Sequence, residues 1–159
     1  MRVWITGASS GIGEEFAYLY AKRGDSVVVT SNEKEKLETV ASKCLELGAG
    51  GAVALPFDLL DSEGIAGLVR QAWDAFGGLD LMYCNAGISQ RTTVEDTSME
   101  MIRRIMEVNY FAPVAMAKAI LPLMLEAGGG HIAAGADLPG VGVGLPGVNR
   151  HIYSSPKWI

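Results

Sequence analysis

Three glycines near the amino terminus, Gly7, Gly11 and Gly13, have the spacing of a loop that binds phosphate groups. They lie between an apolar run, residues 3–5, and a helical pattern that begins near Glu14. We expect Gly7 to permit a tight turn, Gly11 to let the backbone approach a pyrophosphate, and Gly13 to allow close packing of helix against strand. Unpaired amide groups and the positive end of the helix dipole would then face the anion. The loop therefore predicts a nucleotide ligand.

A tyrosine and a lysine near the end of the chain, Tyr153 and Lys157, are four residues apart and would stand on one face of a helix. A tyrosine with an ordinary pKa of about 10 is a poor base at neutral pH. A neighbouring ammonium group favours the phenolate, so Tyr153 would exchange a proton with a substrate oxygen. The alternative is a tyrosine and a lysine on the surface of a helix, without a chemical role.

Asn109 lies in a long helical pattern, four residues before Pro113. Because proline has no backbone N–H, it cannot donate to the carbonyl of Asn109. We therefore expect the helix to kink between these residues and leave that carbonyl able to hold a water molecule. A plain kink between two helices is the alternative.

Segments typical of strands and of helices alternate along the chain and would position these residues. Apolar runs rich in β-branched residues indicate buried strands, and apolar residues at helical spacing indicate amphipathic helices. Asn32 and Ser62 are predicted to cap the helices that follow them, and Thr97 or Ser98 to start the last helix. The predicted strands cover residues 2–6, 26–30, 52–57 and 79–85, and the predicted helices cover 14–23, 33–47, 63–76 and 97 or 98 to about 127.

This alternation predicts an α/β fold, a doubly wound parallel sheet of Rossmann type with right-handed crossovers. No internal repeat or linker interrupts it, so residues 1–159 are expected to form a single domain. A fifth strand is due at 131–136, but that segment lacks a β-branched run, and eight glycines lie between 128 and 147. We therefore expect residues 131–159 to be only a partial catalytic segment and the fold to be incomplete at its C-terminus.

The composition excludes several classes of function. With 49% hydrophobic residues over 159 positions, the chain can bury a substantial core, and a net charge of -5 offers no basic surface for nucleic acid. Cys44 and Cys84 make no disulfide framework, and no Cys/His cluster has the spacing of a metal site. The N-terminus has no signal-peptide pattern, and the most apolar stretch, 114–125, contains Lys118 and Pro122. We expect a cytoplasmic protein with no membrane partner.

Taken together, the motifs resemble those of the classical short-chain dehydrogenase/reductase family over residues 2–157. The glycine loop, residues 6–13, fits the family's T-G-x-x-x-G-x-G pattern, and Asn-Ala-Gly at 85–87 fits the motif after its fourth strand. Asn109 fits the family's catalytic asparagine, and Tyr153 with Lys157 fits its Y-x-x-x-K motif.

The resemblance implies an NAD(P)-dependent oxidoreductase that transfers hydride between a nicotinamide cofactor and a carbonyl or secondary-alcohol substrate. It implies that Lys157 also holds the nicotinamide ribose and that the Asn109 carbonyl belongs to a proton relay through water. By analogy it also implies a small-molecule partner and a homo-oligomer, either a dimer or a tetramer. The implied cofactor-binding residues are Gly7, Ser9, Ser10, Gly11, Ile12, Gly13, Ser31, Asn32, Asp58, Leu59, Asn85, Ala86, Gly87, Tyr153 and Lys157.

The form of the cofactor depends on the residues after the second and third strands. By resemblance, Asp58 accepts a hydrogen bond from the adenine amino group with help from the Leu59 backbone; the alternative is a carboxylate that only flanks a helix. An acidic residue at the end of the second strand would bind the 2′-hydroxyl and favour NAD. This chain has Ser31 there and Asn32 beside it, so a 2′-phosphate fits, although the arginine that often grips it is missing. The sequence thus favours NADP over NAD.

Two features depart from the family pattern. Asp137 stands where the catalytic serine is expected, and no serine lies between Ser98 and Ser154. An ionised aspartate would repel charge on the substrate oxygen, so only a neutral Asp137, its pKa raised by burial, would donate in place of serine. The chain also stops two residues after Lys157, which indicates a fragment, an incomplete chain or an uncertain sequence beyond about residue 130. A dinucleotide-binding module without catalysis, or a scaffold with exposed helices, is the alternative function.

Overall fold

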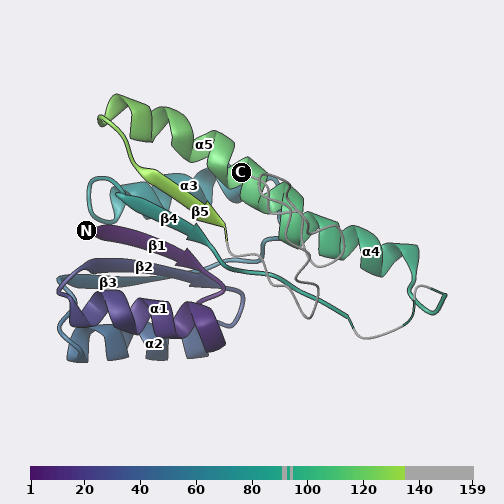
Figure 1. Ribbon diagram of the computed structural model, residues 1–159, viewed down its shortest axis with the longest axis horizontal. Helices are drawn as coiled ribbons and strands as arrows, with labels where there is room; N and C mark the ends of the chain where they lie inside the picture. Colours follow the sequence, from purple (N-terminus) through teal and green to yellow (C-terminus); the bar gives the residue numbers. More distant parts are fainter. Residues whose placement is uncertain (91–92, 94, 135–159) are drawn as a thin grey trace, which may run out of the picture.

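The computed structural model describes residues 1–90, 93 and 95–134, which form a parallel sheet between two layers of helices (Figure 1). Three of the predicted site residues, Asp137, Tyr153 and Lys157, lie outside the described residues. All the other predicted site residues lie within them.

The described residues form a sheet of five strands, all parallel, in the order β3-β2-β1-β4-β5. The strands are β1 (Arg2–Thr6), β2 (Ser26–Ser31), β3 (Gly51–Pro56), β4 (Leu81–Cys84) and β5 (His131–Ala134). The last of these forms without a β-branched run because it pairs with β4, where Ile132 lies opposite Met82. The predicted α/β doubly wound fold is confirmed.

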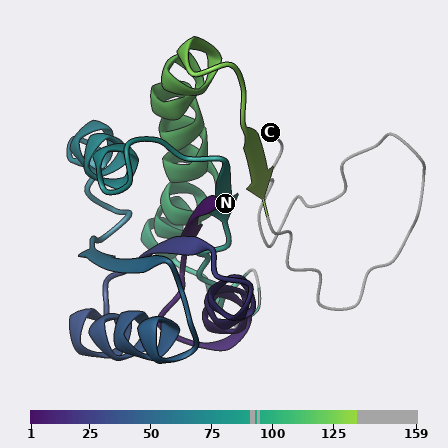
Figure 2. The same cartoon turned by 90° about the vertical axis from the view of Figure 1, so that its left-hand side faces the viewer.

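Helices cover both faces of the sheet, as Figures 1 and 2 show from two directions. They are α1 (Gly11–Lys22), α2 (Lys34–Glu46), α3 (Ile65–Asp74), α4 (Met99–Met106), the π-helical turn η1 (Glu107–Phe111) and α5 (Ala112–Glu126). One face carries α1 and α2, and the other carries α3 and α5.

Alternate residues of the central strands supply two separate cores. Val3 and Ile5 of β1 pack on the side of α1 and α2, whereas Trp4 between them packs on the side of α3 and α5. The same alternation holds in β2, where the middle valine of residues 27–29 belongs to the Trp4 core. A strand that is buried on both faces needs a continuous apolar run, which explains the three successive valines.

Helix α1 begins inside the glycine loop, three residues earlier than predicted. Glycine disfavours helix, so the sequence placed the start near Glu14, yet Gly11 and Gly13 both belong to α1. Gly13 is buried, and a Cβ there would lie 2.6 Å from the Asn85 side-chain nitrogen. Close packing, rather than helix propensity, sets the start of this helix.

Two of the predicted helix caps are wrong. Asn32 does not cap α2: the N-cap residue is Glu33, whose N–H donates to Ser31 Oγ at 3.0 Å. Ser62 does not cap α3, where Asp61 Oδ1 instead accepts from the N–H of the N-cap glycine at 3.1 Å. In both places a short turn closed by a side chain precedes the helix and takes the place of a cap.

The long helical segment begins at its predicted cap, where Ser98 Oγ accepts a backbone N–H at 3.1 Å. The predicted irregularity takes the form of a π-helical turn, η1, in which the Ala112 N–H donates to the Glu107 carbonyl. Pro113 then lies in the first turn of α5, where a missing N–H is tolerated. Single π turns within helices are frequent at functional sites, and this one contains Asn109.

The segment Met99–Glu126 is long and apolar enough, by length and composition alone, to cross a membrane. In this structure 44% of its most apolar window is buried, and Met116 and Ile120 are fully buried in the core between α5 and the sheet. Core helices of folded domains meet the same criteria of length and composition. The absence of a membrane partner stays a prediction.

Candidate functional site: a dinucleotide cavity

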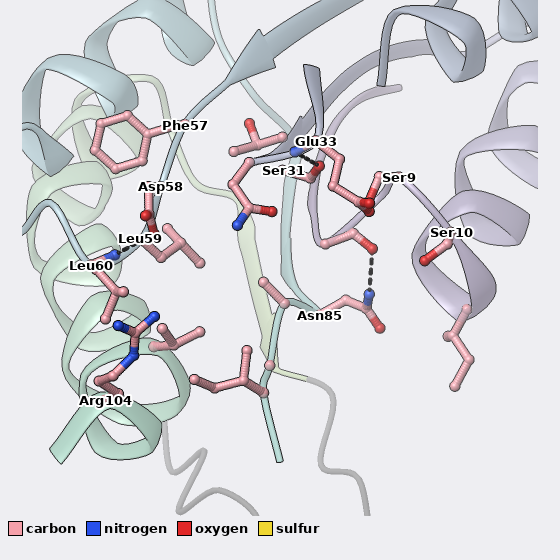
Figure 3. A pocket seen from close by; sticks show the side chains of 18 residues that line it. Ser9, Ser10, Ser31, Glu33, Phe57, Asp58, Leu59, Leu60, Asn85 and Arg104 are labelled. Atoms are coloured by element: carbon pink, nitrogen blue, oxygen red, sulfur yellow. Dashed lines mark hydrogen bonds between the residues drawn. The ribbon is translucent and has the colours of Figure 1, made fainter. Parts of the chain in front are cut away.

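A cavity of about 430 Å³ opens at the carboxyl ends of β1, β2, β3 and β4. Strands β1 and β4 are neighbours in the sheet although β2 and β3 separate them in the chain, and ligands of doubly wound folds bind at this switch point. Figure 3 shows the side chains that converge there. The cavity is lined by Gly7, Ser9, Ser10, Ile12, Thr30, Ser31, Asn32, Glu33, Phe57, Asp58, Leu59, Leu60, Asn85, Ala86, Gly87, Ile88, Arg104 and Val108.

The structure brings together most of the residues that were predicted to bind a cofactor. Among those within the described part of the chain, Gly11 and Gly13 alone are not in the cavity lining. The volume is within the range of roughly 300–1,000 Å³ that is typical of small-molecule sites. Direct contact of these residues with a cofactor stays a prediction.

Gly7 and Gly11 both have the positive φ that favours glycine, +66° and +60°. A Cβ on Gly7 would lie 2.6 Å from Ala86 Cα, so this glycine lets the loops after β1 and β4 touch. A Cβ on Gly11 would meet no atom within 4 Å. Ser10, the N-cap residue of α1, makes no side-chain capping bond. The loop is therefore open to an anion at Gly11, beside the backbone N–H groups of the first helical turn.

The Asn-Ala-Gly motif holds the glycine loop in place. The Asn85 side-chain nitrogen donates to the carbonyls of Thr6 and Gly7, each at 3.2 Å. Thr6 Oγ1 in turn accepts from the N–H groups of Asn85 and Ala86, both at 3.1 Å. The bond from the Asn85 N–H to Thr6 Oγ1 joins residues that are 79 positions apart in the chain. Asn85 therefore lines the cavity and also holds the glycine loop that forms part of its wall.

Asn109, the predicted catalytic asparagine, is buried with 2% of its surface exposed, next to Val108 in the cavity wall. Its Oδ1 accepts from the Ile88 N–H and its Nδ2 donates to the Ile88 carbonyl, both at 2.8 Å. The side chain of Asn109 therefore fixes the chain just after the Asn-Ala-Gly motif. A proton relay through its backbone carbonyl stays a prediction.

Leu59 and Val108 give the cavity an apolar wall, and each is only 7% exposed. Beside them, Asp58 Oδ1 accepts from the Leu60 N–H at 3.0 Å, which holds the carboxylate at the cavity edge. An apolar wall with a few polar groups at its edge suits a flat ring that carries polar substituents, such as a base.

Glu33 also lines the cavity, beside Ser31 and Asn32, and was not among the predicted site residues. Its Oε2 accepts from Ser9 Oγ at 2.8 Å, and its Oε1 accepts from Lys36 Nζ at 2.5 Å. Hydrogen bonds from Lys36 and Ser9 lower the pKa of Glu33 below its ordinary value, so the carboxylate is ionised at neutral pH. From the sequence, Glu33 was interpreted only as the first residue of a helix. Its position just after a predicted strand could have indicated that it belongs to the site.

Arg104 is the second lining residue that the sequence reasoning missed. Figure 3 shows its side chain projecting from α4 beside Leu60, on the same side of the cavity. It precedes Val108 by four residues, so the two share one helix face, and this spacing is visible in the sequence. Among the described lining residues it carries the only positive charge.

Within the described residues, no group of three or more His, Cys, Asp or Glu side chains is placed to hold a metal ion. Cys44 and Cys84 are buried, and neither forms a disulfide within the described part of the chain. The proton-transfer residues predicted from the sequence, Tyr153 and Lys157, and Asp137 at the serine position lie outside the described part of the chain.

The profile of the family described as "short chain dehydrogenase" matches residues 1–158 of this sequence. The chain belongs to the short-chain dehydrogenase family. The resemblance that four motifs predicted is thereby confirmed.

Curated relatives of this chain include the human protein "Dehydrogenase/reductase SDR family member 7", 38% identical over 144 residues, which are 89% of this chain and 42% of that protein. The bovine "Dehydrogenase/reductase SDR family member 7B" is 38% identical over 160 residues, 98% of this chain and 48% of that protein. The chain thus spans about half the length of the curated relatives it matches.

A solved metagenomic short-chain oxidoreductase in complex with NADP has the same fold, with a TM-score of 0.82 and 30% identity over 88% of this chain and 63% of that one. In this chain, residues in and beside the cavity fit a dinucleotide. Gly11 leaves open space at the N-terminus of α1 for a pyrophosphate, and Leu59 with Val108 provides an apolar wall for a base.

Proposed function

We propose that this protein is an NAD(P)-dependent oxidoreductase that transfers hydride between a nicotinamide dinucleotide and a small carbonyl or secondary-alcohol substrate. The convergence of four strand-end loops on one cavity, which Gly7, Ser9, Ser10 and Ile12 of the glycine loop help to line, is the observation that supports this function best. A bound nicotinamide would supply or accept the hydride, while the chain binds, orients and transfers protons.

The described residues would bind the dinucleotide. The first turn of α1, beginning at Gly11, would hold the pyrophosphate through backbone N–H groups. Leu59 and Val108 would enclose the adenine, and the Asp58 carboxylate would accept a hydrogen bond from its amino group. Asn85 would keep the glycine loop in the shape that this binding needs.

Proton transfer would fall to residues that family membership suggests. We propose that Tyr153 exchanges a proton with the substrate oxygen, that Lys157 favours its phenolate, and that the Asn109 carbonyl orders a water beside them. Asp137 stands in the place of the usual serine, where only its neutral form would donate to the substrate oxygen.

Two neighbouring residues of the cavity wall, Ser31 and Glu33, favour different forms of the cofactor. Ser31 leaves room for a 2′-phosphate and predicts NADP, the cofactor bound in the solved metagenomic relative. The Glu33 carboxylate in the same wall opposes a second negative charge.

We also propose a cytoplasmic homo-oligomer, a dimer or a tetramer, that binds no nucleic acid. Exposed apolar side chains on the long helical segment support the self-association: Phe111 is 51% exposed, Leu121 48% and Leu125 68%. Light scattering on the purified protein measures the oligomeric state directly.

The experiment that tests the proposed function combines binding with turnover on the complete protein. Calorimetry measures the dissociation constants of NAD and NADP, and the absorbance of reduced nicotinamide follows turnover of a panel of ketones and secondary alcohols. Tyr153→Phe is expected to abolish turnover while dinucleotide binding remains. The matched control is Tyr20→Phe, because Tyr20 of α1 does not line the cavity, and it should leave both unchanged.

The results of the binding and turnover measurements distinguish the oxidoreductase from a module that only binds dinucleotides. Dinucleotide binding with turnover that depends on Tyr153 supports the oxidoreductase. Binding without turnover of any substrate in the panel supports instead the module that binds dinucleotides without catalysis, which the aspartate at 137 would explain. Absence of binding to either dinucleotide contradicts both functions.

A further inference from the structure

The side chain of Arg104 lies between two cavities. It is part of the wall of the dinucleotide cavity, and it also lines a second cavity of about 410 Å³ beside the start of α4. The residues that line the second cavity are Ile88, Ser89, Ser98, Glu100, Met101 and Arg104. Because Arg104 is exposed and borders open space in both cavities, its side chain is not part of a packed core.

The described residues do not neutralise the charge of Arg104. Three other arginines, Arg2, Arg23 and Arg70, each pair with an aspartate. Arg104 belongs to none of the ion pairs among the described residues. Its helix, α4, contains no buried residue, so Arg104 does not support a core from there either. A structural role within the described part of the chain therefore does not account for its place in the cavity wall.

Arg104 lies on the side of the dinucleotide cavity that suits the base. It precedes Val108 by one helical turn, and Figure 3 shows its side chain beside Leu60, the neighbour of Leu59 in the chain. Leu59 and Val108 form the apolar wall for the base. The glycine loop follows β1 whereas Leu60 follows β3, and with β2 between them these strands are roughly 10 Å apart. The guanidinium is thus nearer to the place of the base than to that of the pyrophosphate.

Resting on the proposed function, we propose that Arg104 stacks its guanidinium on the adenine of the bound dinucleotide and covers the base at the mouth of the cavity. A guanidinium is planar, always charged and weakly hydrated, and it stacks on flat π-systems, including nucleic-acid bases. The attraction between a cation and the face of such a ring supplies the binding energy. Because NAD and NADP carry the same adenine, Arg104 strengthens the binding of both.

The test compares four forms of the complete protein: wild type, Arg104→Gln, Arg104→Lys and Arg103→Gln. Lysine keeps the positive charge but lacks the planar group. Arg103 is the matched control, because it is the adjacent residue of α4, is also exposed and lines neither cavity. Calorimetry gives the dissociation constants of NAD and of NADP for each form, and thermal melting checks that each variant is folded.

Arg104→Gln is expected to weaken the binding of NAD and of NADP by the same factor, about five- to tenfold, and Arg104→Lys by at least about threefold. Arg103→Gln should stay within about twofold of wild type. Unchanged binding in Arg104→Gln, or an equal loss in Arg103→Gln, overturns the proposal.

Two further results would overturn it by assigning Arg104 another role. A loss confined to NADP would place Arg104 on the 2′-phosphate, and full affinity in Arg104→Lys would leave only an effect of charge. Failure of the wild type to bind either dinucleotide overturns the proposed function instead, which distinguishes the two failures.

Discussion

Replacing Gly11 by alanine tests directly whether a dinucleotide lies against the glycine loop. Gly11 has a φ of +60°, and a Cβ built on it meets no protein atom within 4 Å. The added methyl group therefore strains the backbone but displaces nothing in the protein. A loss of dinucleotide affinity beyond the effect of that strain would therefore come from contact between the methyl group and the ligand.

The size of both effects follows from the structure. Alanine at this positive φ costs about 1–2 kcal/mol, partly offset because alanine also restricts the unfolded chain. For a chain of this size the melting temperature should fall by roughly 2–8 °C. A methyl group in the path of the pyrophosphate would weaken hydrogen bonds to a charged group worth about 1.5–3 kcal/mol. Dinucleotide binding should therefore weaken by about 10- to 100-fold.

Gly77 provides the control. Its φ is +66° and a Cβ on it also meets nothing within 4 Å, but it lies after α3, away from the cavity lining. Calorimetric binding of NAD and NADP and thermal melting are measured for Gly11→Ala, Gly77→Ala and wild type. The two variants should lose similar stability, and Gly11→Ala alone should lose affinity.

Equal dinucleotide affinity in Gly11→Ala and Gly77→Ala, at similar melting temperatures, would refute the assignment of Gly11 to the pyrophosphate. Gly7→Ala is no substitute for this test. Its Cβ would lie 2.6 Å from Ala86 Cα, so that variant would shift the Asn-Ala-Gly motif and disturb the whole cavity.

Three further predictions concern the supports of the site and the core. Asn109→Ala is expected to cost about 1–3 kcal/mol in urea unfolding, because both Ile88 backbone groups lose their partner, and an unchanged midpoint would contradict this. Asp80→Asn should cost up to about 1 kcal/mol at neutral pH, as the Arg2–Asp80 pair is more than a third exposed. The hydrogen bond from Arg2 lowers the pKa of Asp80 in the folded protein. The stability that the Arg2–Asp80 pair contributes is therefore present above the unfolded pKa of about 3.9 and is lost as the pH falls through the lower folded pKa. At that low pH the unfolding free energies of Asp80→Asn and wild type should converge. Burial raises the pKa of Cys44 to about 11, so mass spectrometry should show slow maleimide labelling at neutral pH until urea unfolds the chain.

The strands and the cavity floor were predictable from sequence because their signals are local. Three successive valines at 27–29 require a strand buried on both faces, and alternation with helices requires a parallel sheet. Since parallel strands end at one edge, the residues that follow them gather there without further information. Ser31, Asp58 and Asn85, which the family resemblance assigned to the cofactor, all line the cavity, and each lies at or just after the end of a predicted strand.

What the sequence missed depends on contacts between distant segments or on the direction of a side chain. The start of α1 at Gly11 is set by packing of Gly13 against Asn85, which overrides the low helix propensity of glycine. Glu33 enters the cavity because Ser9, 24 residues earlier, binds its carboxylate. The helical pattern alone would place an acid at this point on the surface, paired with Lys36.

The hydrogen bonds around Ile88 also bear on what Asn109 can do. Both polar atoms of its side chain bind the Ile88 backbone, so any role in proton transfer would fall to its backbone carbonyl. That carbonyl belongs to the π-helical turn, which precedes Pro113 in the chain. One residue would then hold the loop after β4 with its side chain and order a water with its main chain. The same asparagine thus links the shape of the dinucleotide cavity to the place where protons would move.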